Sequence, residues 1–342
     1  MYTVLGRIEL EEQTVWDRRS GKERRPFRDG CGARAHGYSR RLQRAISDFG
    51  ADESFARAAA KVAEHYGLTL PVSGCRRVTL QHALACHAHR LPAGPTPPAE
   101  QLIGEMDGSM VPIVTPTAPP SADRRQGKRL AWKEAKLALI RRPGETSTRV
   151  AASLDDAQAS GEEWSALAKA CGFGKRSRLH AVGDGAPWIA EQVERHFGRQ
   201  ATYLVDFFHV CEHLAPVAAY AGGDASAWLD VQKSRLRAND WPAVLDALAP
   251  WIEPEPQAPT PARDCDRYLR ARSHQLNYRD ALAADLPIGS GEVESAHRSV
   301  VQHRLKKPGA WWRSHTAQAM LDLCCLRHND QWDRYWQSLA SA

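Results

Sequence analysis

The segment at residues 286–298 reads LPIGSGEVESAHR, and it continues as SVVQHRLKK to residue 307. Its two glycines and its serine predict a turn followed by a capped helix. That helix carries carboxylates in its first turns and cations along the rest of its length. An acidic group on an otherwise basic helix suits a protein that holds a metal ion beside a phosphodiester. The alternative is a capped surface helix on which Glu294 pairs with Arg298, four residues further on.

Length and composition predict a soluble globular protein of two or three domains. The chain has 342 residues, of which 43% are hydrophobic and 25% are charged. No run of about 18 apolar residues occurs, so we expect no membrane-spanning helix. Arg7 and Glu9 lie near the start of the chain, which argues against a signal peptide. We therefore expect a cytoplasmic protein.

Cysteine spacing and charge further limit the kinds of protein that this sequence can encode. None of the eight cysteines forms a Cys-x-x-Cys pair, so we expect neither a zinc ribbon nor a disulfide framework. The net charge is +6, and residues 1–44 hold eleven Lys and Arg against six Asp and Glu. A basic arm of this kind, which we place at residues 1–50, contacts nucleic acid or stays solvated.

Residues 51–91 have the outline of a helix-turn-helix. A helix is predicted at residues 54–67, ending at a glycine, and Ser73 can cap a second helix. The second helix offers side chains that can reach bases or phosphates, namely Arg76, Arg77 and Gln81. An ordinary helical hairpin has the same outline. A Pro-rich linker is predicted at residues 92–100.

Beyond the linker the pattern alternates between strands and helices. Strands are predicted at residues 102–108, with 111–114 as a hairpin partner, and at 136–140, 149–151, 179–185 and 203–209. Helices are predicted at residues 162–171 and 187–197, with a mostly helical region at 215–279 and a helical tail after Glu294. The order of the elements predicts a mixed α/β fold with a helical insert.

Three carboxylates have positions that suit metal binding: Asp107, Asp184 and Glu294. Each aspartate lies in or at the end of a predicted strand and is followed by glycine, which leaves the carboxylate uncrowded. A single Asp-Gly is most often a turn, but three carboxylates in this order are far more specific. Convergent oxygen donors suit two Mg²⁺ ions, with Mn²⁺ as a substitute, and this pair of metals can cut or join phosphodiesters.

Four blocks of the sequence resemble bacterial insertion-sequence transposases. They are GDGAPWI at residues 183–189, DFFHVCEHL at 206–214, GSGEVES at 289–295 and VQHRLK at 301–306. The chain is similar to the ISKra group of the Mutator-like clan of DDE transposases over roughly residues 45–340. The resemblance implies an α/β ribonuclease-H-like core at residues 101–214, an all-helical insertion at 215–285, and a catalytic Glu helix with a helical tail at 286–342.

The resemblance also implies the roles of individual residues. Asp107, Asp184 and Glu294 would be the catalytic, metal-binding triad, with Glu292 as the rival for the last position. His209 would approach the scissile phosphate or support the site. The alternative for His209 is a buried histidine at a strand end, bonded to the supporting residue Asp206.

The basic residues of the last block are predicted to contact DNA phosphates: Arg298, Arg304, Lys306 and Lys307. The expected partners are terminal inverted repeats and target DNA, bound by a homodimer or a higher assembly in the bacterial cytoplasm, associated with the nucleoid. Two alternatives are a ribonuclease-H-like nuclease without strand transfer and a DNA-binding regulator that has lost catalysis.

Overall fold

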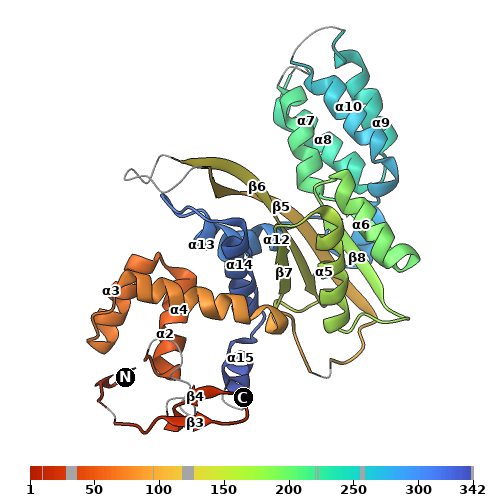
Figure 1. Ribbon diagram of the computed structural model, residues 1–342. Coiled ribbons are helices and arrows are strands. Elements are labelled where there is room, and N and C mark those ends of the chain that lie inside the picture. Colours follow the sequence, from red (N-terminus) through yellow and green to blue (C-terminus); the bar gives the residue numbers. More distant parts are fainter. Residues whose placement is uncertain are drawn as a thin grey trace.

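The computed structural model describes residues 1–9, 11–27, 37–94, 96–117, 127–219, 221, 223–254 and 259–339. It shows a mixed α/β protein whose five-stranded sheet stands between two helical parts. Figure 1 shows the N-terminal helices and the α7–α10 helices at opposite ends of the molecule, with the sheet and α14 between them. No described helix combines the length and the apolar character that crossing a bilayer requires.

The N-terminal part contains short strand pairs and three helices. The strands are β1 (Tyr2–Thr3), β2 (Gly6–Arg7), β3 (Val15–Asp17) and β4 (Lys22–Arg24), and the helices are α2 (Arg40–Asp52), α3 (Phe55–Tyr66) and α4 (Val72–Ala85). Two of these helices, α3 and α4, match the predicted pair. The prediction of an arm up to residue 50 is wrong for α2, because Ser39 caps that helix and Leu42 and Ile46 are buried one turn apart.

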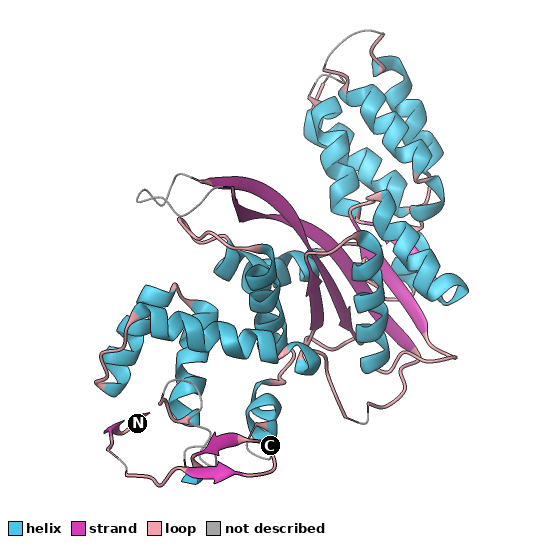
Figure 2. Ribbon diagram, in the orientation of Figure 1, coloured by secondary structure: helices cyan, strands magenta, loops and turns pink. Residues whose placement is uncertain are grey.

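The sheet has the strand order β7-β6-β5-β8-β9. Its strands are β5 (Gln101–Pro116), β6 (Lys128–Arg141), β7 (Arg149–Ser153), β8 (Arg178–Gly183) and β9 (Ala201–Val205). The pairs β5–β6 and β6–β7 are antiparallel, whereas β5–β8 and β8–β9 are parallel. Figure 2 shows the long β5–β6 pair extending beyond the rest of the sheet.

The expected hairpin within residues 102–114 is wrong, because β5 is a single strand that passes straight through Gly108 and pairs with β6. A Cβ atom at Gly108 would lie 2.1 Å from Oε1 of Glu134. The glycine therefore serves close packing within the strand instead of a turn.

Alternating residues of the strands face different helices. Leu137 and Leu139 of β6 belong to a core with α12 (Gly291–Ala296), α13 (His303–Leu305) and α14 (Ser314–His328). Ala138 and Ile140 belong to a core with α5 (Ala157–Ala170) and α6 (Pro187–Phe197). Side chains on a strand point alternately to the two sides, so the sheet is covered on both faces.

A separate helical unit follows β9. Its helices are α7 (Phe207–Ala218), α8 (Ala225–Arg237), α9 (Trp241–Leu248), α10 (Pro261–Ala271) and α11 (Tyr278–Ala283), and they share one apolar core. The unit begins at Phe207 and not at residue 215, because α7 packs with α8 and α10. The predicted strand at residues 203–209 is correspondingly too long at its end.

Two features of the C-terminal part matter for the site. A π-helix, His297–Gln302, joins α12 to α13. The last helix, α15 (Trp332–Ser338), returns to the N-terminal helices, where Tyr335 Oη lies 2.8 Å from Nδ1 of His82. The C-terminal segment thus contacts both the sheet and the N-terminal part.

Candidate functional site

The parallel register of β5 and β8 brings Asp107 and Asp184 to adjacent positions. Glu105 pairs with Val182, so that Asp107 and Asp184 each lie two residues beyond the same pair. Neighbouring strands are roughly 4.8 Å apart, so Asp184, just beyond the end of β8, lies beside Asp107, which is inside β5. After Asp184 the chain turns at Gly185, whose φ of 83° is a left-handed conformation that favours glycine.

The electrostatics of Asp107 reflect this closeness. Burial raises the pKa of Asp107 above its ordinary value, and the negative charges of Asp184 and Glu134 raise that pKa further, while His209 lowers it. Its side chain remains 30% exposed. A pair of crowded carboxylates that is open to solvent favours a bound cation.

The helix α12 lies against the same strand and carries Glu294 in its first turn. Three residues further along, the buried His297 contacts Asp107, with Nε2 3.1 Å from the carbonyl oxygen and 3.5 Å from Oδ2. Burial lowers the pKa of His297 to about 4, and Glu294 is among the charges that act on the ring. The ring is therefore neutral at pH 7 and can donate from Nε2 to the main chain of Asp107.

The expected residue His209 lies in the first turn of α7, not in a strand. Its side chain is half-buried, and its Nδ1 lies 3.4 Å from the carboxylate of Glu212. Only its main-chain N–H contacts Asp206, at 3.1 Å. The proposed side-chain bond between His209 and Asp206 is therefore not what the structure shows.

The helical unit holds the turn after β8. Tyr268 Oη donates to the carbonyl oxygen of Asp184 at 2.8 Å, and Arg272 Nε donates to that of Gly185 at 2.8 Å. Tyr203 Oη also accepts from the N–H of Gly185, at 3.2 Å. These bonds fix the main chain at Asp184. The Oδ1 atom of Asp184 also accepts a hydrogen bond from the N–H of Ala186 at 2.8 Å.

Asp206 connects the end of β9 to the glycine-rich turn before α12. Its Oδ1 accepts from the N–H groups of Phe208 and His209, and its Oδ2 accepts from both N and Oγ of Ser290 at 2.6 Å. Ser290 stands at the N-cap of α12, as expected, but makes no side-chain cap bond to that helix. Its hydroxyl serves Asp206 instead.

Glu105, which lies on β5, supplies the cap bond to α12 that Ser290 does not make. The residue is fully buried, and its Oε2 accepts from the N–H of Val293 at 2.8 Å. Burial raises the pKa of Glu105 to about 7, with Glu292 and Asp206 adding to the rise and Arg141 opposing it. A carboxylate at a helix N-terminus satisfies a free N–H and interacts with the helix dipole.

Replacing Glu105 by glutamine is expected to remove one source of pH-dependent stability. A carboxyl group with a raised pKa in the folded state stabilises the fold below its unfolded pKa of 4.5, and this contribution is lost as the pH rises through about 7. Glu105→Gln should therefore match the wild type near pH 5 and exceed it by about 3 kcal/mol at pH 8. Urea denaturation at both pH values measures this difference.

The same comparison removes the effects of other groups. The buried His82 and His297 have pKa values lowered to about 4, and they change stability in the opposite direction as the pH rises. These histidines are present in both proteins, so they cancel in the difference. A gap between variant and wild type that stays constant with pH would show that Glu105 is charged throughout.

The described part of the chain contains no group of three or more His, Cys, Asp or Glu side chains arranged to hold a metal ion. The donor chemistry near Asp107 and Asp184 is nevertheless that of hard oxygen ligands, which Mg²⁺ prefers. The predicted metal-binding role of Asp107, Asp184 and Glu294 stays a prediction.

The predicted DNA-contacting residues fall into two groups. Arg76, Arg77 and Gln81 are exposed on α4, and Arg298 and Lys306 are exposed near α12. Lys306 Nζ donates to Ser109 Oγ at 2.7 Å, and Lys307 Nζ lies 3.4 Å from the carboxylate of Glu53. Arg304 differs from the expectation of a surface contact, because it is only 2% exposed and its Nε donates to the carbonyl oxygen of Gly50.

Sequence reasoning overlooked Glu105 and His297. Each has a signal in the sequence, because Glu105 lies two residues before Asp107 on the same face of a strand, and His297 lies three residues after Glu294 on a helix. The two-residue repeat of a strand and the three- to four-residue repeat of a helix together predict that both side chains lie near the acidic pair. The contact of Glu105 with α12 depends on tertiary packing and has no such signal.

Comparison with known proteins adds a partial likeness in backbone arrangement. No protein-family model and no curated protein sequence matches the chain. Among solved structures, the Drosophila P element transposase strand transfer complex superposes with a TM-score of 0.32 at 9% sequence identity. The match covers 87% of this chain and 80% of that one. A TM-score this low carries no argument about fold or function, so function is inferred from the residues of this chain.

Proposed function

We propose that the chain is a DNA transposase that cleaves and transfers DNA strands with Asp107, Asp184 and Glu294 as its acidic triad, on a ribonuclease-H-like core. One observation carries the proposal. The parallel register aligns Asp107 with Asp184, and the helix that bears Glu294 lies against the same strand. Two of the four sequence blocks that resemble insertion-sequence transposases contain Asp184 and Glu294, and the resemblance implies Asp107 as the first aspartate of the triad.

Glu294 fits the third position better than Glu292 does. Glu292 acts on the buried Glu105, whereas Glu294 acts on His297, which contacts Asp107 directly. His297 would orient the main chain at Asp107, and Tyr268 would hold the turn at Asp184. The three carboxylates would hold two Mg²⁺ ions, which supply activation of the attacking oxygen and stabilisation of the leaving oxygen.

The surface of α4 would bind the terminal inverted repeats. Arg76, Arg77 and Gln81 are exposed there, and their side chains suit contacts with phosphates and base edges. Joining the two ends of an element requires that both be held together, so we propose a homodimer or a higher assembly on DNA. A bacterial cytoplasmic location, associated with the nucleoid, follows from that substrate.

The first test is metal-dependent cleavage by the full-length protein. A labelled duplex that carries the flanking inverted repeat is incubated with Mg²⁺, with Mn²⁺, or with a chelator, and a target plasmid is added in parallel. Nicking at the repeat end only when metal is present, followed by joining to the plasmid, is the expected result. Cleavage without joining would indicate a nuclease, and specific binding without cleavage in either metal would indicate a regulator.

A further inference from the structure

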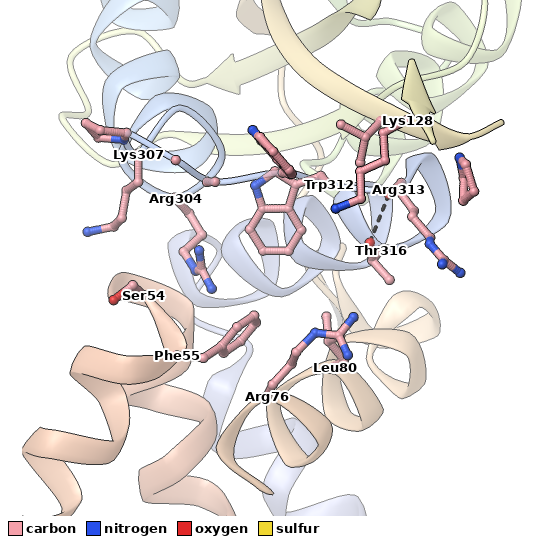
Figure 3. Close-up of a pocket in the computed structure, with 16 residues that line it drawn as sticks. Ser54, Phe55, Arg76, Leu80, Lys128, Arg304, Lys307, Trp312, Arg313 and Thr316 are labelled. Carbon is pink, nitrogen blue, oxygen red and sulfur yellow. Dashed lines mark hydrogen bonds between the residues drawn. The ribbon is translucent and has the colours of Figure 1, made fainter. Parts of the chain in front are cut away.

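A cleft of about 410 Å³ lies where the N-terminal helices meet the long β5–β6 pair, away from the acidic pair. Its walls come from α3, α4, the ends of β5 and β6, and the segment at residues 304–316. Figure 3 shows Arg76 and Phe55 on one side, and Lys128, Trp312 and Arg313 on the other. The volume is within the range of small-ligand sites.

The lining of the cleft is strongly cationic. It includes Arg76, Lys128, Arg304, Lys307 and Arg313, and no carboxylate is among the lining residues that the structure describes. Burial lowers the pKa of Arg304 to about 10, so its guanidinium stays charged at pH 7. The charge of Lys307 is neutralised by Glu53, which does not line the cleft. The charge therefore favours an anionic ligand such as a phosphate.

Two buried donors in the same cleft lack hydrogen-bond partners among the described residues. They are Nη2 of Arg304 and Nε1 of Trp312, and these residues are 2% and 5% exposed. A buried donor without an acceptor destabilises a protein, and such groups are usually satisfied by a ligand or by water. Both nitrogens are shut off from solvent within the wall of the cleft, so they show that this wall holds unsatisfied polar groups.

An aromatic surface adjoins these donors. Trp311 is 49% exposed, and the ammonium of Lys128 lies 4.5 Å from the centre of its ring. Phe55 and Trp312 line the cleft beside it, with the guanidinium of Arg304 over both rings. Cationic grooves with exposed aromatic rings are typical of sites for unpaired bases, because a base in a duplex has both faces covered.

We infer that this cleft binds an unpaired nucleotide of a DNA strand, with the base against Trp311 and the phosphate near Arg76 and Arg313. The choice of DNA as the source of the nucleotide rests on the proposed function. The nucleotide chemistry itself follows from the cationic lining and the exposed indole of Trp311.

The test measures the binding of a fluorescent oligothymidylate to the full-length protein by anisotropy, beside a hairpin duplex of the same length. Trp311→Ala is expected to weaken oligothymidylate binding about tenfold and to leave duplex binding within about twofold, whereas Trp311→Phe keeps most of the affinity. Arg313→Ala should weaken binding and reduce its salt dependence.

Two control variants match the side chains but lie outside the cleft. Trp132 is 59% exposed on β6, and Arg176 is exposed just before β8, at the opposite end of β5 from the cleft. Trp132→Ala and Arg176→Ala are expected to bind like the wild type. Equal losses in Trp311→Ala and Trp132→Ala would overturn the inference, as would a free mononucleotide that competes as well as the oligothymidylate.

Asp184→Asn separates this inference from the proposed function. The variant is expected to lose cleavage and to keep oligothymidylate binding, because Asp184 does not line the cleft. If neither the wild type nor any variant cleaves DNA, but Trp311→Ala still selectively weakens oligothymidylate binding, the cleft is supported and the catalytic proposal fails. If wild type cleaves DNA but Trp311→Ala has no effect on oligothymidylate binding, the cleft proposal fails alone.

Discussion

Asp184→Asn is expected to lower metal-dependent DNA cleavage by at least about 10³-fold and to leave duplex binding intact. Asparagine keeps the shape of the side chain but removes the negative charge that would bind a divalent cation. Metal binding supplies several kcal/mol to the transition state, and each 1.36 kcal/mol is a factor of ten in rate. The same substitution relieves repulsion with Asp107, so the variant should also unfold at a slightly higher temperature.

The two glutamates of α12 provide the matched comparison for this experiment. Glu294→Gln should reduce cleavage as strongly as Asp184→Asn, whereas Glu292→Gln should retain most of it, because Glu294 is the carboxylate proposed as the third metal ligand and its charge acts on His297, which contacts Asp107. Both residues are exposed, so neither variant should unfold. Cleavage that survives in Glu294→Gln but not in Glu292→Gln would assign the third carboxylate to Glu292.

Asp206→Ala is expected to lower the free energy of unfolding by about 3–5 kcal/mol. The buried carboxylate accepts four hydrogen bonds, two at the start of α7 and two from Ser290. Alanine would leave these buried donors without a partner and would release the turn before α12. Urea denaturation measures the loss, and faster hydrogen exchange at the amides of Phe208 and Ser290 would locate it.

Asp224 offers a control with the same cap and no second contact. It is exposed at the start of α8 and accepts from the N–H groups of Ser226 and Ala227. Asp224→Ala should therefore cost only about 1 kcal/mol, the usual value of an N-cap. Similar losses in the two variants would show that the bonds from Asp206 to Ser290 contribute nothing to stability.

Much of the fold could be predicted where one periodicity dominates. The helix at residues 187–197 coincides with α6, because Pro187 marks its first turn and Gly198 follows its last residue. The strands predicted at residues 136–140 and 149–151 lie within β6 and β7, and the strand predicted at 179–185 runs two residues past the end of β8. Asp184 lies just beyond the end of β8, whereas Asp107 lies in the interior of β5, and the metal-binding role of both residues is untested.

The errors have identifiable physical causes. The sequence pattern predicts a turn near Gly108 and a strand through Asp206, yet Gly108 makes room for Glu134 inside β5 and Asp206 caps a helix. Both outcomes depend on a neighbour that is distant in sequence. The burial of Arg304 between Phe55 and Trp312 has the same origin, because only the packing of α13 against the N-terminal helices excludes solvent there.

The π-helix at His297–Gln302 sets the number of residues between the acidic and basic parts of the C-terminal segment. The N–H of His303 donates to the carbonyl oxygen of Arg298, five residues earlier, so this turn holds one residue more than an α-helical turn spanned by four. Each residue of an α-helix advances the direction of its side chain by about 100°. Shortening the segment by one residue would turn Arg304 away from Phe55 while Val293 and Ala296 of α12 stayed packed against the sheet. Evolution can therefore change residue types in this stretch far more freely than it can change its length.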